Sequence, residues 1–228
     1  MIHTNAKEVI RDFVFGMEDG LVSNLGLVLG VYVGGGNVFT IILAGAASMF
    51  AGAFSMSAGS YLSSKSQREV YEQEIRATKD NLMKNPRKCY LEMKSSLLKE
   101  GLGREEIGAL FQKSSKYKHP EFVCNYMVQK KVGISKEKLE VPLKNAFTMF
   151  LSFLLGSSFP LAPFLFLPLL PAAVTATVLT MASLFGVVWA KSLYTKLSWF
   201  KSGMEVVFIG FGAGLIGYLV GWAVRHLG

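Results

Sequence analysis

The chain has 228 residues and a formal net charge of +8, with 51% hydrophobic and 18% charged residues. Soluble domains carry about 25% charged residues, so this composition argues against an ordinary soluble domain. The mean hydropathy of +0.36 indicates a membrane protein. The apolar residues form long runs towards both ends of the chain, and most of the charge lies in the middle.

Two membrane-spanning helices are predicted at residues 13–33 and 38–62, because a bilayer core requires about 20 mainly apolar residues per helix. The sequence GGGN at 34–37 separates them. The second run contains AGAASMFAGAFSMSAGSY, whose small residues allow helix backbones to approach closely in a membrane. The N-terminus lacks the features of a cleavable signal peptide, so the first run is expected to remain as a membrane helix.

Residues 63–145 form a polar insert, which holds 18 Lys or Arg and 11 Asp or Glu between positions 65 and 144. Its first part, SKSQREVYEQEIRATKDNL, is predicted to continue the second helix beyond the membrane. Three shorter helices are expected to follow, the first ending at Gly101, because glycine is typical just after a helix. We therefore expect a small helical domain on the membrane surface.

Three further spans are predicted at residues 146–166, 172–190 and 206–224. The last one carries glycines at a spacing suited to helix packing. The turn between the first two is marked by Pro160, Pro163, Pro168 and Pro171. The predicted fold is all-α, with residues 1–62 and 146–228 forming five transmembrane helices and residues 63–145 inserted between the second and third.

Basic and uncharged connections alternate along the chain. The insert is basic, and so is the link that holds Lys191, Lys196 and Lys201, whereas the other two links carry no charge. Basic loops remain on the cytosolic side of membranes. We therefore expect a multi-pass protein with the N-terminus and insert in the cytosol and the C-terminus outside it. The membrane itself, plasma or vacuole-like, stays open.

Ionisable residues inside a span are costly, which makes them candidates for function. Glu18 and Asp19 lie in the first span and Glu205 opens the fifth. The alternative for Asp19 is that Asp19-Gly20 is only the helix entry, with the carboxylate in water.

The second span adds Ser48 and Met56. A carboxylate beside a thioether suits ferrous iron better than magnesium or calcium. The short link makes the first two spans antiparallel neighbours, which allows Asp19 and Met56 to lie at similar depth. The alternative is that Met56 only fills space in the packing.

Other classes of function find little support. The two cysteines, Cys89 and Cys124, match no metal or disulfide spacing and are interpreted as chance thiols in a reduced compartment. The insert interleaves acids with its bases and lacks an aromatic stacking motif, so we expect no nucleic-acid partner. Its charge is better explained by anionic lipid beside it. We find no nucleophile–base pair or phosphate loop, and expect neither an enzyme nor a permanently bound cofactor.

The segment VIRDFVFGMEDGLVSNLGLVLGV resembles the first span of the vacuolar iron transporter family. AGAFSMSAGSYLSSKSQREVYEQE resembles its second span and the start of its insert, and FPLAPFLFLP and MEVVFIGFGAG fit its later spans. The resemblance covers almost the whole chain, and its most specific parts are DGL and SM-x-x-G-x-Y-L.

The resemblance implies a homodimeric, proton-coupled exporter of ferrous iron, and in some cases manganese, from cytosol to vacuole. It implies that Asp19 is the pathway aspartate and Met56 the pathway methionine. Ser48 stands where plant members carry a glutamate, so this chain lacks one proton-accepting metal ligand.

In plant members the insert is a metal-binding domain built on glutamates and a methionine pair. Glu74 and Met127 match that pattern and Glu72 lies near it. Four other family positions are occupied by Thr78, Asn81, Val128 and Lys131. We therefore expect weak iron binding by the insert, or a different ligand set drawn from Glu69, Glu92 and Glu121.

Two hypotheses remain. The first is a transporter of ferrous iron or manganese that works by proton antiport, with Asp19, Met56, Ser48 and Glu18 along its pathway. The second is a membrane-embedded metal-binding or regulatory protein of the same family that no longer transports.

Overall fold

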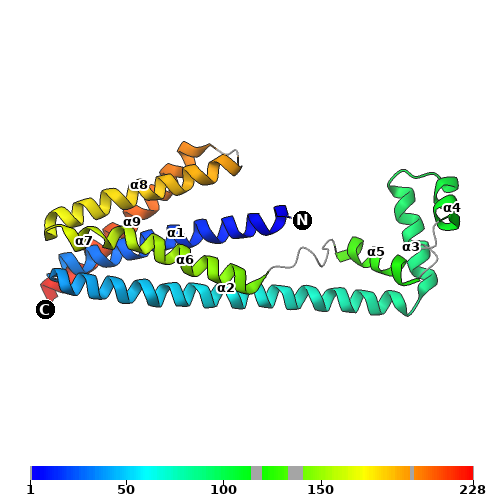
Figure 1. Ribbon diagram of the computed structural model, residues 1–228, viewed down its shortest axis with the longest axis horizontal. Coiled ribbons are helices and arrows are strands. Elements are labelled where there is room, and N and C mark those ends of the chain that lie inside the picture. The colour runs from blue at the N-terminus through cyan, green and yellow to red at the C-terminus, as the bar shows by residue number, and fades with distance from the viewer. Residues whose placement is uncertain (1, 114–119, 133–140, 196–197, 228) are drawn as a thin grey trace. The chain divides into compact units, whose positions relative to one another are not determined.

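The computed structural model describes residues 2–113, 120–132, 141–195 and 198–227 (Figure 1). Every regular element in these ranges is a helix, which confirms the all-α prediction. The helices are α1 (Ile2–Val33), α2 (Val38–Met83), α3 (Pro86–Lys99), α4 (Arg104–Lys113), α5 (Pro120–Val132), α6 (Pro142–Leu161), α7 (Pro163–Phe166), α8 (Leu169–Thr195) and α9 (Trp199–Leu227).

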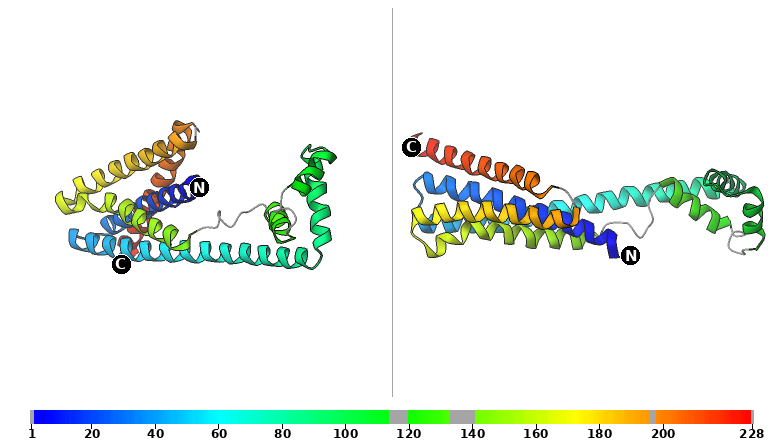
Figure 2. Two further views of the ribbon diagram at one scale, coloured as in Figure 1. Left: turned by 45° about the vertical axis from the view of Figure 1, so that its right-hand side comes forward. Right: turned by 90° about the horizontal axis from the view of Figure 1, so that it is seen from above.

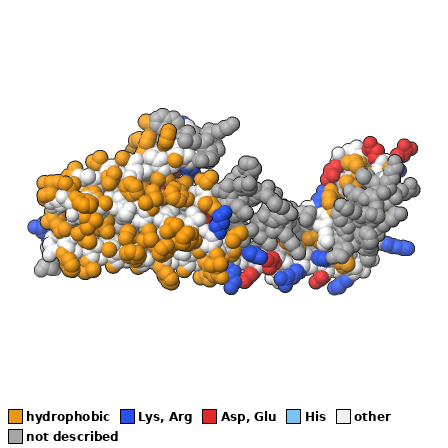
Figure 3. All heavy atoms as spheres, in the orientation of Figure 1, with side chains coloured by type: hydrophobic (Ala, Val, Ile, Leu, Met, Phe, Trp, Pro, Cys, Tyr) orange, Lys and Arg blue, Asp and Glu red, His pale blue; other side chains and the backbone are white. Residues whose placement is uncertain are grey.

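The chain divides into two compact units. Unit 1 comprises Met1–Ser64 and Val141–Gly228, and unit 2 comprises Lys65–Glu140. Helix α2 contributes its first part to unit 1 and its last part to unit 2. Hydrophobic side chains cover the visible face of unit 1, whereas Lys, Arg, Asp and Glu are concentrated on unit 2 (Figure 3).

Four helices in the described residues are long and apolar enough to cross a membrane: Val9–Val33, Val38–Met83, Leu169–Ser192 and Phe200–Leu227. Helix α6, the predicted third span, is not among them. It ends at Leu161, five residues earlier than predicted, so any 18-residue stretch of it includes Lys144 and Asn145. The count of five spans therefore stays a prediction.

The boundaries between the helices follow local chemistry. Gly35 has a φ of +93°, a left-handed conformation that only glycine adopts without strain, and it closes the turn between α1 and α2. The Asn37 side chain then caps α2 by accepting a 2.9 Å hydrogen bond from the Thr40 N–H. Pro160, predicted to mark a turn, lies buried inside α6 instead. The turn prediction was wrong there because a proline near the end of a helix removes only one hydrogen bond.

Helix α1 packs against α6, α8 and α9 (Figure 2). Along α1, Gly16 and then Gly20 contact Ser152 and then Ser157 of α6. Further along, Gly26 and then Gly30 contact Ala213 and then Gly217 of α9. Helices α1, α6 and α9 therefore run in the same direction. Helix α2 runs the other way, since Gly45 contacts Leu161 and Gly52 contacts Phe153.

Unit 2 has its own hydrophobic core. The end of α2 contributes Ile75 and Leu82, and the rest comes from α3, α4 and α5. Gly101, which follows α3 with a φ of +96°, fits the predicted helix end. Cys89 of α3 and Cys124 of α5 form a disulfide with a Cα–Cα distance of 5.6 Å. The interpretation of these cysteines as unrelated thiols was therefore wrong, because helix packing, not sequence spacing, brings them together.

The contact between α1 and α9 generates a stability prediction. A Cβ atom added at Gly217 would clash with the Gly26 backbone, whereas one added at Gly212, also in α9, would meet open space. Gly217→Val is expected to destabilise the protein by about 1–3 kcal/mol, the usual cost of overpacking. Gly212→Val is the matched control. Thermal unfolding in detergent should show a lower Tm for Gly217→Val only; equal Tm values would contradict this packing.

Candidate transport pathway and its polar residues

Asp19 lies well inside α1, which begins at Ile2, so the alternative that Asp19-Gly20 is a helix entry is wrong. Its side chain is half-buried, and Oδ1 accepts a 3.1 Å hydrogen bond from the Ser23 hydroxyl. The next residue, Gly20, lies against α6. Because Phe15 and Ser23, one turn away on either side, are exposed, Asp19 lies on a face of α1 that the described helices leave open.

The positions of Met56 and Ser48 follow from that of Gly52, which lies between them on α2. A Cβ at Gly52 would meet the Phe153 ring, and a Cβ at Gly20 would meet the Phe153 carbonyl oxygen. Asp19 and Gly52 are therefore at the level of one α6 residue. Met56 and Ser48 are half-buried. Each is one turn of α2 from Gly52, in opposite directions, and so about 6 Å from the level of Asp19. Among the described residues, Asp19 and Met56 share only α6 as a neighbour. No described contact joins the Asp19 carboxylate to the Met56 sulfur.

Glu18 occupies a different environment from its neighbour Asp19. It is half-buried, and its Oε1 atom is buried without a hydrogen-bond partner in the described part of the chain. Lys191, near the end of α8, acts on it electrostatically. Glu205 does not open a helix as predicted, because α9 begins at Trp199; its side chain is exposed. The sequence missed the Glu18–Lys191 relation because the two residues lie on separate helices.

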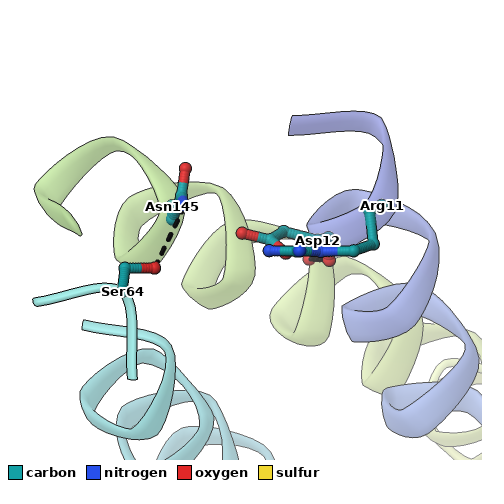
Figure 4. A network of polar contacts seen from close by, with 5 residues as sticks. Arg11, Asp12, Ser64 and Asn145 are labelled. Carbon is teal, nitrogen blue, oxygen red and sulfur yellow. Dashed lines mark hydrogen bonds and ion pairs between the residues drawn. The ribbon is translucent and has the colours of Figure 1, made fainter. Parts of the chain in front are cut away.

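Asp12 is a buried acid that the sequence reasoning missed. It is 3% exposed, and its Oδ1 lies 3.0 Å from Arg11 Nε (Figure 4). On α6, the Ser152 hydroxyl donates a 3.4 Å hydrogen bond to the Asp12 carbonyl oxygen. Asp12 lies two turns before Asp19, and residues seven apart share a helix face. That spacing was a signal that could have found it.

Two hydrogen bonds link α6 to its neighbours through buried amide side chains. Asn145 donates a 3.1 Å hydrogen bond to the Ser64 hydroxyl of α2 (Figure 4). Asn24 of α1 donates a 2.8 Å hydrogen bond to the Ser157 carbonyl oxygen. The Asn24 Oδ1 atom and the Ser157 hydroxyl are buried without partners among the described residues. The interface of α6 with α1 and α2 is therefore partly polar.

The predicted metal ligands of the insert are not gathered in one place. Glu72 forms ion pairs with Arg68 at 2.9 Å and Arg76 at 3.6 Å, one turn away on either side. Glu74 is exposed, and residues two apart lie on opposite sides of a helix. Met127 is buried in the core of unit 2. Within the described residues, no group of three His, Cys, Asp or Glu side chains is placed to hold a metal.

The alternative ligands of the insert are likewise dispersed. Glu69 lies 3.9 Å from Lys65, as an exposed ion pair. The side chain of Glu121 is outside the described part of the structure. Glu92 is the one that the structure brings near a predicted ligand, since it lines a pocket of about 360 Å³ together with Met127.

Comparison with known proteins shows the family of the chain. Residues 10–222 match the model of the VIT family. The chain is 30% identical to vacuolar iron transporter 1 of Eucalyptus grandis, covering 91% of this chain and 83% of that protein. It is 28% identical to vacuolar iron transporter 1 of Arabidopsis thaliana, covering 98% and 89%. It is 26% identical to protein CCC1 of Saccharomyces cerevisiae, covering 89% and 65%. The chain therefore belongs to the VIT family.

Proposed function

We propose that this protein carries a divalent metal ion, ferrous iron first among candidates, out of the cytosol across a membrane. The observation that carries the proposal is the place of Asp19, a half-buried carboxylate in the middle of a membrane-type helix, on a face that the described helices leave open. The names of the relatives, vacuolar iron transporters over almost the full length, support iron as the substrate.

The pathway runs past Asp19 and Met56. Asp12 precedes Asp19 by two turns of α1, but it is buried and paired with Arg11, so Asp19 is the carboxylate that a metal ion reaches on the open face. Met56 adds a thioether within about a turn of the same level. An oxygen with a sulfur ligand suits ferrous iron, while manganese, which prefers oxygen, is a second substrate held mainly by the carboxylate.

Proton exchange follows from the ligand chemistry. A carboxylate binds a metal ion only in its deprotonated form, so metal and proton compete for Asp19. One residue can therefore bind the two cargoes in turn, which is the minimum that an antiporter requires. Ser48 cannot take part in this exchange, since a hydroxyl does not lose its proton at ordinary pH. The chain thus relies more heavily on Asp19 than a homologue with a second carboxylate would.

A homodimer provides the cover that the pathway needs. A carboxylate facing lipid is costly, yet Phe15 and Ser23 on the Asp19 face of α1 are exposed in the single chain. Helix α2 also exposes Phe39, Phe50 and Phe54. A second copy packed against these faces about a two-fold axis would enclose the pathway between identical surfaces.

The protein is a multi-pass component of a vacuole-like or plasma membrane. Following the distribution of basic residues, unit 2 and the N-terminus lie in the cytosol and the C-terminus on the other side. Unit 2 then meets the metal first. A second function, a metal-binding or regulatory protein that does not transport, is favoured by Ser48 in place of a carboxylate and by the lysine-rich insert, and a flux measurement separates the two.

The first prediction of this proposal concerns Asp19. Asp19→Asn keeps the size of the side chain and removes both its charge and its titration, so ferrous iron flux into proteoliposomes should be lost with or without a pH gradient. Glu205→Gln, an exposed acid on α9, is the matched control and should retain flux. Flux at the wild-type rate in Asp19→Asn would place the pathway elsewhere. Metal binding without flux in the unmutated protein would favour the regulatory function.

The second prediction concerns Met56. Met56→Leu keeps the volume but removes the soft ligand, so iron flux should fall more than manganese flux, because manganese tolerates oxygen ligands alone. Met204→Leu, on the exposed side of α9, controls for the loss of a thioether as such. An equal fall in iron flux and manganese flux would mean that Met56 only fills space between the helices and does not bind metal.

The third prediction concerns the dimer. Mass measurement in nanodiscs should show two copies, and Phe15→Cys should form a cross-linked dimer on mild oxidation, because Phe15 shares the face of Asp19. Val174→Cys, equally exposed on α8, should not cross-link. A strictly monomeric protein that still transports metal would refute the shared pathway.

A further inference from the structure

The core of unit 2 contains four sulfur-bearing side chains that the transport pathway does not use. Cys89 and Met93 come from α3, and Cys124 and Met127 from α5. They are 1%, 1%, 0% and 4% exposed, respectively. All four belong to one cluster of buried residues. Each of the two helices therefore contributes one buried cysteine and one buried methionine to this core.

The contacts between α3 and α5 fix how these sulfurs are arranged. Cys89 and Cys124 are bonded, and further along both helices Glu100 forms an ion pair with Lys130. Between these two contacts, Met127 lines a pocket with Ser96 of α3. Helices α3 and α5 are therefore parallel where they contact each other.

It follows that the four residues form two adjacent layers. Met93 comes one helical turn after Cys89, and Met127 comes nearly one turn after Cys124, on the same faces as the cysteines. The Cα atoms of the two methionines lie about 5–6 Å further along the helices than those of the cysteines. Long side chains in a helix point back towards its N-terminus, so the methionine sulfurs are directed towards the cysteine layer.

Sulfur ligands of this kind select a soft metal ion. Thiolates and thioethers favour Cu(I), whereas carboxylates and water favour hard ions such as magnesium and manganese. The surrounding side chains, among them Ile75, Ile107 and Val123, are apolar and buried. An apolar shell excludes water from a metal site and so protects the reduced metal.

We propose that Cys89, Cys124, Met93 and Met127 bind one Cu(I) ion when the two cysteines are reduced. The pocket of about 360 Å³ that Glu92 and Met127 line gives metal a route from solvent to Met127, the first of the four ligands that it meets. The site shares Met127 with the residues considered for iron in the insert but includes none of the glutamates, and it does not depend on whether the protein transports.

The disulfide is the closed state of the same site. An external dithiol gives two electrons and two protons to the S–S bond, forms its own disulfide and leaves two thiols. Leu82 provides an acceptor for one of them, since its carbonyl oxygen lies 3.2 Å from Cys89 Sγ. Binding of Cu(I) then releases the thiol protons to solvent. Sulfurs bonded to each other cannot both ligate a metal ion, so oxidation expels copper.

The test uses the full-length protein in detergent, reduced with a dithiol that is then removed under anaerobic conditions. Cu(I) is added in competition with a coloured Cu(I) chelator, and near-ultraviolet absorption of the copper–thiolate bond is followed. The reduced protein is expected to bind one equivalent and to keep it in an excess of Fe²⁺, whereas the oxidised protein binds none. Equal copper binding by both forms, or displacement by Fe²⁺, would overturn the proposal.

Variants identify the ligands. Cys89→Ser should weaken copper binding by at least about 100-fold and Met127→Leu by about 10-fold, since losses of this size follow even from weaker changes around metal sites. Met83→Leu, a partly exposed methionine outside the cluster, is the control and should bind as the unmutated protein does. Met127→Leu preserves core volume, so its result stands even where Cys89→Ser does not fold. If Met127→Leu bound Cu(I) with unchanged affinity, Met127 would not be a ligand and the four-sulfur site would be refuted.

Discussion

The close approach of the α1 backbone to α6 and α9 is the constraint on which the rest of unit 1 depends. Lipid tails are as apolar as leucine, so membrane helices associate through dense packing of small residues and not through the hydrophobic effect. Gly20 turns towards α6, and Gly26 and Gly30 turn towards α9. These contacts fix the rotation of α1 about its own axis. Whatever is not on those faces, Asp19 above all, is left on the side that remains open.

This rotation gives two adjacent acids different environments. Asp19 shares an open face with Phe15 and Ser23, while Glu18 is turned by about 100° to where Lys191 acts on it. A metal ion can approach the Asp19 carboxylate on the open face, whereas Glu18 lies on another face with its Oε1 atom buried. The geometry therefore favours Asp19 over Glu18 as the transport residue, although the sequence places them side by side.

The sequence predicted most of the helices but few of the contacts between them. Runs of apolar residues and the GGGN turn were sufficient to place α1 and α2, because both signals are local. The errors occurred where a helix extends beyond its apolar part, as α9 does before Glu205, or passes through a proline, as α6 does at Pro160. The Cys89–Cys124 contact was missed because residues 35 apart in sequence meet only through the packing of α3 on α5. Asp19 and Met56 were candidates from their residue types, and the resemblance assigned them to the pathway; the structure adds that Asp19 and Gly52, one turn from Met56, lie against the same residue of α6.

In the proposed arrangement, unit 1 offers the Asp19 carboxylate with the Met56 thioether, whereas the core of unit 2 offers sulfurs alone. The preference of hard and soft ions for these ligands separates their cargoes without a size filter. A passing substrate must leave its ligands again, and a half-buried carboxylate that protons can reclaim allows this. In a four-sulfur site enclosed in a core, protons do not displace the metal ion at ordinary pH. The metal ion is released only when oxidation removes the thiolates. Exchange of protons therefore suits the membrane pathway, and exchange of electrons suits unit 2, because each mode of release follows from the chemistry of the ligand that holds the metal.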